Sequence, residues 1–118
     1  MSVHVRFRVA GGGYALPVAN VLEVAEVGLL APVPGAPSPV RGVRNLHGQV
    51  LAVVDLAVAL GVERNHQASR LLIVESEGRR AGLVIDEVVD VAELPSEKPE
   101  ELLDLDEVFQ AVEARAAA

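Results

Sequence analysis

The amino-acid sequence predicts a mainly β protein, built as small barrels or a sandwich, that ends in one helix. The first observation is a series of short apolar runs separated by glycine, proline and polar residues, which is typical of strands joined by tight turns. The second is the composition of 51% hydrophobic but only 3% aromatic residues, so valine, leucine, alanine and isoleucine have to build the core. The third is that a helical spacing of apolar residues is found only near the C-terminus.

Three strands are expected in the first part of the chain, over residues 3–9, 14–17 and 20–27. In the first of them, apolar residues alternate with His4, Arg6 and Arg8, which predicts that these three side chains face solvent. The glycines at 11–13 are expected to form the turn that follows, because glycine adopts positive φ without steric cost.

A proline-rich loop and a hairpin are expected next. Four prolines within residues 31–39 remove backbone donors and fix φ, which predicts an extended loop. The stretch VRGVRNLHGQVLAVVDL, residues 40–56, predicts a strand, a tight turn and a second strand. Gly42 and Gly48 are expected to let the backbone bend in this hairpin.

The last part of the chain combines helical and strand signals. Asp55 can cap one or two helical turns that Gly61 closes. Further strands are expected over residues 70–75, 81–85 and 87–92. A helix over about residues 105–116 is indicated by the i, i+3, i+4, i+7 spacing of Leu105, Val108, Phe109 and Val112. We expect residues 1–118 to form a single domain.

Composition excludes several classes of function. The formal net charge of −7 disfavours binding to nucleic acid, because phosphate backbones repel an acidic protein. The absence of cysteine rules out disulfides, thiolate nucleophiles and cysteine-ligated zinc. The N-terminus does not resemble a signal peptide, and no apolar run reaches the roughly 18 residues that span a bilayer. We therefore expect a soluble, cytoplasmic protein with no membrane insertion.

Groups with catalytic or metal-binding potential are scattered. The histidines at 4, 47 and 66 lack the spacing of a zinc site, and no serine lies in a G-x-S-x-G turn. The remaining candidates for acid–base chemistry are the carboxylates of Asp55, Asp86, Glu87 and Asp90. The simpler interpretation is that they occupy strand ends and turns. The sequence thus predicts no enzyme, metal or cofactor, with a small carboxylate-based enzyme as an alternative.

Several blocks in order resemble the CheW-like proteins, the adaptors that join bacterial chemoreceptors to the histidine kinase CheA. They are YALPVANVLEV (14–24), the GVRNLHG segment with its following strand and Asp-Leu, RLLIVESEGRRAGLVIDEVVDV (70–91), and the tail LLDLDEVF. The resemblance covers nearly the whole chain. It implies two small five-stranded β-barrels, similar to Src-homology-3 domains, packed on a shared core. It also implies a non-catalytic adaptor located at cytoplasmic receptor arrays.

The resemblance also implies binding sites. A groove for the cytoplasmic helical tip of a chemoreceptor would involve Val21, Glu23, Arg44, His47 and Leu71. In it, Val21 and Leu71 would supply apolar contact, and Glu23 would pair with a receptor base or orient the groove. The CheA-type kinase would be contacted through the barrel end at Val18.

One departure from the family pattern lies in the hairpin. The family's Asn-Leu-Arg-Gly, whose arginine contacts the receptor, is Asn45-Leu46-His47-Gly48 here. Histidine is shorter than arginine and does not carry a fixed charge. Receptor preference is then expected to differ, with Arg41 or Arg44 as a substitute source of positive charge. The alternative is that His47 is only an exposed turn residue.

A second departure is the short AELPSEKPEE segment that precedes the tail. On the order of 20 to 30 residues of the family pattern are absent, which is more than an ordinary connecting loop. The second barrel is therefore expected to be trimmed. Because the absent segment carries a ring-forming contact in the family, one alternative is a reduced adaptor that binds receptors but couples poorly to the kinase. Others are a homodimer through the trimmed barrel and a barrel module of a different two-component system.

Overall fold

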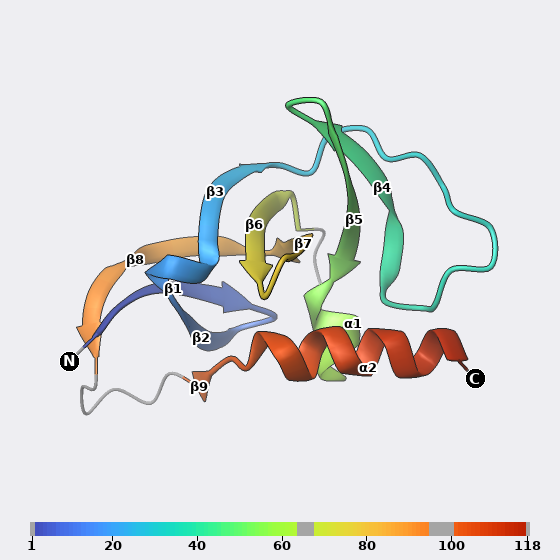
Figure 1. Ribbon diagram of the computed structural model, residues 1–118. Helices are drawn as coiled ribbons and strands as arrows, with labels where there is room; N and C mark the ends of the chain where they lie inside the picture. Colours follow the sequence, from blue (N-terminus) through green and yellow to red (C-terminus); the bar gives the residue numbers. More distant parts are fainter. Residues whose placement is uncertain (1, 64–67, 95–100, 118) are drawn as a thin grey trace.

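The computed structural model describes residues 2–63, 68–94 and 101–117, which form two sheets and one main helix (Figure 1). The four-stranded sheet, in the order β8-β1-β2-β9, comprises β8 (Glu87–Leu94), β1 (Ser2–Val9), β2 (Gly12–Pro17) and β9 (Glu101–Leu102). The five-stranded sheet, in the order β3-β6-β7-β5-β4, comprises β3 (Val21–Glu26), β6 (Arg70–Ser76), β7 (Arg79–Ile85), β5 (Gln49–Asp55) and β4 (Val40–Leu46). The helical segments are the 3-10 turn η1 (Val18–Asn20), α1 (Leu56–Leu60) and α2 (Leu105–Ala117). The predicted fold class is confirmed.

The five-stranded sheet curls until its two edges meet. Its edge strands are β3 and β4, and the Arg44 guanidinium on β4 donates a hydrogen bond to the carbonyl of Glu26 on β3. Just after β3, Ala31 and Val43 exchange two backbone hydrogen bonds of 2.9 Å. These contacts close the sheet into a small barrel, which leaves an open mouth near the β4–β5 turn.

The two sheets share one plan. In the five-stranded sheet, β3-β6 and β6-β7 are antiparallel pairs and β7-β5 is parallel. The four-stranded sheet repeats this pattern, with antiparallel β8-β1 and β1-β2 and parallel β2-β9. In both, the last of these strands leads into a helix that begins at an aspartate, Asp55 before α1 and Asp104 before α2. Within the described residues, the difference between the sheets is β4, which adds a fifth strand outside β5.

Three hairpins turn in two residues, each with a non-glycine residue at positive φ followed by a glycine. These pairs are Ala10-Gly11, His47-Gly48 and Glu77-Gly78, with φ of 51–52° and then 80–85°. Such mirror-image turns match the right-handed twist of the strands that they join. The turn expected at the glycines 11–13 therefore lies at residues 10 and 11, and Gly12 and Gly13 belong to β2.

The main core lies between the two sheets and α2. It is made of aliphatic side chains with few rings, among them Phe7 and Tyr14, whose centroids are 6.1 Å apart. Phe109 of α2 joins this core, and the Arg79 guanidinium lies 4.9 Å from its ring centroid. In Figure 1, α2 runs along one side of the strands, and it contacts α1. Its residues Leu105, Val108 and Phe109 belong to the main core together with residues of both sheets.

The histidine of the first strand is not placed as the sequence predicts. His4 is only 6% exposed, with Pro17 and Ala92 as its cross-strand neighbours, whereas Arg8 on the same face is exposed as predicted. Alternation shows which residues share a face, but it does not show whether that face meets solvent. His66 lies outside the described residues.

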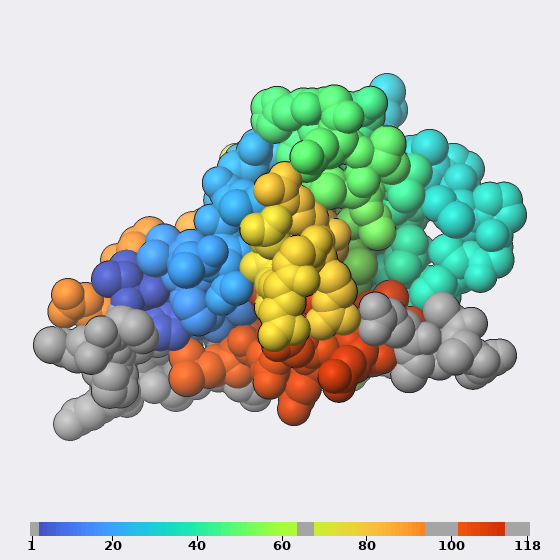
Figure 2. Space-filling model, in the orientation of Figure 1, coloured from blue at the N-terminus to red at the C-terminus, as the bar shows by residue number. Residues whose placement is uncertain are grey.

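The proline-rich loop, residues 31–39, extends away from the body of the molecule (Figure 2). It contains a turn in which the Ala36 N–H donates to the Val33 carbonyl. Over the ranges that the structure describes, no helix has both the length and the apolar character required to cross a membrane.

Candidate functional site

A cleft of about 220 Å³ opens at the mouth of the five-stranded barrel. It is lined by residues from β3, β4, β5, β6, β7 and the β4–β5 turn, namely Leu22, Glu23, Leu46, His47, Gln49, Leu51, Ile73 and Arg80. Leu46, Leu51 and Ile73 belong to the buried cluster inside this barrel, so the cleft has an apolar floor. Polar and charged side chains form its rim.

One side of the rim is a contact across the barrel mouth. His47 Nε2 lies 3.2 Å from Glu23 Oε2, so the β4–β5 turn and the edge strand β3 meet there. The turn itself is fixed by a 3.1 Å hydrogen bond from the Gly48 N–H to Asn45 Oδ1. Both side chains of the pair remain largely accessible, and a partner that enters the cleft would meet them first.

The other side of the rim is built around Arg80 of β7. Its guanidinium donates to Glu75 Oε2 on β6 and to Gln49 Oε1 on β5. These bonds hold the charge of Arg80 at the edge of the cleft. The arrangement of a small apolar floor inside a charged rim suits recognition of a protein side chain, and it contains no nucleophile with a neighbouring base.

Known proteins similar to this chain identify its family. A family model described as "CheW-like domain" matches residues 4–114. This chain belongs to the CheW-like family. Protein FrzA of Myxococcus xanthus is 37% identical over 91 residues, which cover 75% of this chain and 57% of FrzA. A probable chemotaxis protein CheW of Rhizobium etli is 30% identical over 111 residues, which cover 89% of this chain and 72% of that protein.

A solved structure shows the same fold. The scaffolding protein TtCheW from Thermoanaerobacter tengcongensis superposes with a TM-score of 0.75 at 31% identity, covering 80% of this chain and 66% of that one. The match to PilI of Pseudomonas aeruginosa, at 34% identity, covers 51% of PilI. The chain thus spans little more than half the length of FrzA and PilI.

Only some of the residues that the CheW-like resemblance singles out lie at the cleft. Glu23 and His47 meet at the cleft, as described above. Val21 is half-buried and packs against the main core, and Arg44 lies over Gly28 while it bonds the Glu26 carbonyl. Val18, assigned to the kinase contact, is 45% exposed in η1.

Leu71 does not lie on the surface, where the expected apolar contact with a receptor would require it. Its side chain is fully buried inside the five-stranded barrel, where it packs against Gly82 of β7. Leu71 therefore supports the floor of the cleft from within and does not supply a direct contact to a partner. The structure adds Leu22 to the lining of the cleft, where it is exposed like Val24 and Glu26 on the same face of β3.

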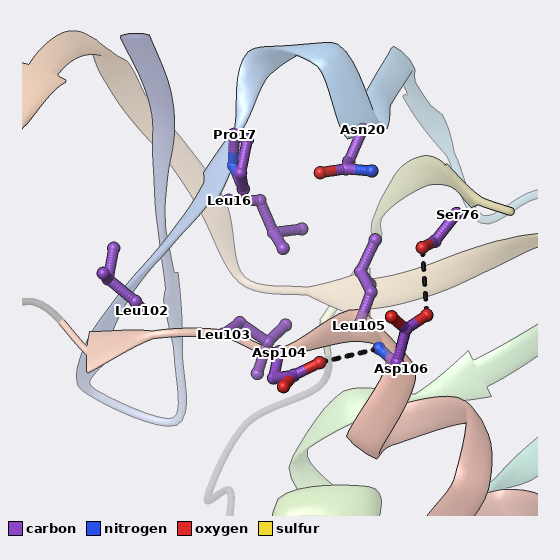
Figure 3. Close-up of a pocket in the computed structure, with 9 residues that line it drawn as sticks. All are labelled: Leu16, Pro17, Asn20, Ser76, Leu102, Leu103, Asp104, Leu105 and Asp106. Atoms are coloured by element: carbon purple, nitrogen blue, oxygen red, sulfur yellow. Dashed lines mark hydrogen bonds between the residues drawn. The ribbon is translucent and has the colours of Figure 1, made fainter. Parts of the chain in front are cut away.

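A second hollow, of about 440 Å³, lies where β2, the β6–β7 turn and the start of α2 meet (Figure 3). Leu16 and Leu105 point into it, and polar groups come from Asn20, Ser76 and Asp106. Ser76 Oγ donates to Asp106 Oδ1 over 3.0 Å, and Asp106 also accepts from Arg79. The carboxylate thus fastens the start of α2 to the β6–β7 hairpin.

The carboxylates considered for catalysis also have structural contacts. Asp86 accepts a 2.9 Å hydrogen bond from the Ala10 N–H, Glu87 lies near Arg8, and Asp90 is bound by Arg6. Asp55 accepts from the Ala57 N–H and from Arg41. No group of three potential metal ligands occurs within the described ranges.

Proposed function

We propose that this chain is a non-catalytic adaptor of a bacterial chemosensory array, which links the cytoplasmic tip of a chemoreceptor to a CheA-type histidine kinase. Membership of the CheW-like family supports this proposal, as does similarity to proteins named as chemotaxis and scaffolding proteins. The observation that carries it is the cleft at the barrel mouth, where Glu23 and His47 form a polar rim above an apolar floor. The adaptor would act in the cytoplasm, at the receptor array.

The receptor tip would enter this cleft. An apolar receptor side chain would lie on the floor, and Leu22 would extend the apolar contact along β3. A basic group of the receptor would compete with His47 for Glu23. The kinase would use the neighbouring apolar surface at Val18, which η1 places just before β3.

A charge reversal at Glu23 tests the receptor site. Glu23→Lys should weaken binding to a purified receptor tip by more than tenfold, equivalent to about 1.4 kcal/mol. Stability should barely change, because exposed ion pairs contribute little to folding. Glu26→Lys is the matched control, since it makes the same charge change on β3 outside the cleft.

Comparing these two variants distinguishes the loss of a direct contact in the cleft from the effect of a changed net charge. Binding by Glu23→Lys that equals the wild type would place the receptor site elsewhere. Equal weakening by Glu23→Lys and Glu26→Lys would show that net charge, and not the cleft, is being measured. Thermal unfolding of each variant checks that both remain folded.

A second candidate function is a reduced adaptor. It is suggested by the four-stranded sheet, which has no counterpart of β4 among the described residues. A ring of adaptor and kinase needs two different interfaces on every member, because head-to-tail contacts must close on themselves. A reduced adaptor would bind receptors through the cleft but couple poorly to the kinase. The test is titration into a receptor–kinase assembly that lacks its own adaptor, with kinase activity as the readout. Full activation would exclude the reduced adaptor, and receptor binding without activation would support it.

A further inference from the structure

The shared plan of the two sheets identifies an edge with a missing neighbour. In the five-stranded sheet, β4 pairs antiparallel with β5, so that Val40 lies opposite Val54 and Gly42 opposite Val53. The counterpart of β5 in the four-stranded sheet is β9, which pairs with β2 on one side. Within the described ranges, no strand pairs with β9 on its other side. Unpaired strand edges are templates for pairing with another chain.

Asp55 and Asp104 occupy equivalent positions in the two sheets, but their charged neighbours differ. Arg41 of β4 donates a 2.8 Å hydrogen bond to Asp55 Oδ2, while Asp55 Oδ1 caps α1 by accepting from the Ala57 N–H. Asp104 caps α2 in the same manner, with its Oδ1 accepting from the Asp106 N–H at 3.0 Å. Among the residues that the structure describes, however, no arginine or lysine pairs with Asp104.

A groove of about 260 Å³ runs beside β9, between this strand, α1 and α2. It is lined by Ala59, Leu60, Leu102, Leu103, Asp104, Glu107, Val108 and Ala111. Most of these side chains are apolar, and Leu102 is 62% exposed. The two carboxylates of Asp104 and Glu107 make the groove acidic. The groove thus combines apolar surface with negative charge, as does the edge of β5 that β4 covers and that Arg41 neutralises at Asp55.

We propose that this groove accepts an extended strand from a partner protein, added antiparallel to β9. Strand addition of this kind takes its affinity from backbone hydrogen bonds and its specificity from alternate side chains. The chemistry of the incoming strand follows from β4: an apolar residue opposite Leu103, a small residue opposite Leu102, and an arginine or lysine between them that pairs with Asp104. This partner contact is separate from the receptor cleft and does not depend on the proposed adaptor function.

The incoming strand is assigned to a different protein and not to a second copy of this chain. The strand of this chain with the required pattern is β4, and it is held in its own sheet by β5 and by Ala31. Two copies would also each bring a net charge of −7, and the groove between them would be acidic. Like charges at close range oppose association.

A synthetic peptide with the sequence of residues 40–46, VRGVRNL, is the probe for this groove. We expect saturable binding to the full chain, with the largest amide chemical-shift changes at β9 and the first turn of α2. Leu102→Lys in the protein and Arg41→Glu in the peptide should each weaken binding by about tenfold or more, as loss of a central contact does. Asp104→Arg should weaken binding too, and a peptide with Arg41→Asp should restore it.

Val50→Lys is the matched control, because Val50 is a similarly exposed apolar residue, 67% accessible, on β5 of the other sheet. It should bind the peptide like the wild type. The proposal is overturned if the peptide does not bind, if Leu102→Lys binds it equally well, or if the shifts fall on β5 because the peptide displaces β4. A peptide-free dimer in sedimentation that Leu102→Lys dissociates would also overturn it, since the occupant would then be a second copy.

Discussion

Gly42→Ala should destabilise the five-stranded barrel far more than alanine at other turn glycines of this chain. Gly42 lies at the register shift in the β4–β5 ladder, with φ of +150°. A Cβ added there would lie 2.6 Å from the carbonyl oxygen of Ala31. That oxygen cannot move away easily, because it accepts the backbone hydrogen bond of Val43 that closes the barrel.

The expected magnitude has two parts. Forcing alanine into this backbone conformation costs about 1–3 kcal/mol, as for other residues in sparsely populated regions. Overpacking against a fixed backbone atom adds about 1–3 kcal/mol. Gly61→Ala is the control, because Gly61 also has positive φ, at +73°, but an added Cβ meets no atom within 4 Å. It should show only the conformational part, about 1–2 kcal/mol.

Urea unfolding of both variants, compared at a common m-value, gives the two losses of unfolding free energy. If Gly42→Ala costs no more than Gly61→Ala, then the contact between β4 and Ala31 is not what holds the barrel closed. The same variant should weaken receptor binding, because the mouth of the barrel is shaped by this closure. A destabilised variant with unchanged receptor affinity would contradict that link.

Three further substitutions probe the helices and turns. Phe109→Ala should lower the unfolding free energy by about 3–5 kcal/mol, because it removes a core side chain that Arg79 covers. An unchanged melting midpoint would mean that α2 does not pack on the main core. Glu77→Asn should raise the free energy of unfolding by about 0.5–1 kcal/mol in urea unfolding, because asparagine tolerates the positive φ of this turn. A lower free energy of unfolding would contradict the turn geometry. Asp55→Ala should cost about 1–2 kcal/mol through loss of the α1 cap, measured by urea unfolding, and Asp55→Asn should retain most of that cap; equal losses would assign the effect to the Arg41 ion pair instead.

Much of the fold follows from local sequence signals. The tight hairpin at residues 40–56 and the short helix between Asp55 and Gly61 are both found where the sequence predicts them. In each case the responsible groups are close together in the chain, such as the Asp55 carboxylate and the Ala57 N–H. Local chemistry of this kind is independent of how distant strands pair.

The candidate site depends on pairings that the sequence does not reveal. Arg80 reaches the cleft because β7 lies parallel to β5, and nothing in the neighbourhood of residue 80 indicates this partner. Leu22 lines the cleft because the edge strand β3 meets the β4–β5 turn across the barrel mouth. Leu71 shows the opposite error: an apolar run predicts a strand, but the full burial of this side chain is set by the curling of the whole sheet.

The central position of β1 affects how the chain folds during synthesis. β1 is synthesised before the other strands described here, yet it lies between β2 and β8, and its Arg6 pairs with Asp90, 84 residues later in the chain. The strands of the five-stranded barrel all lie between residues 21 and 85, so this barrel can form before β8 leaves the ribosome. Until then Phe7 and its neighbours have no complete sheet to pack in, and long-range pairings of this kind form slowly. We therefore expect the four-stranded sheet to be completed after the barrel, and its exposed apolar strands to be the part of the nascent chain that needs protection from aggregation.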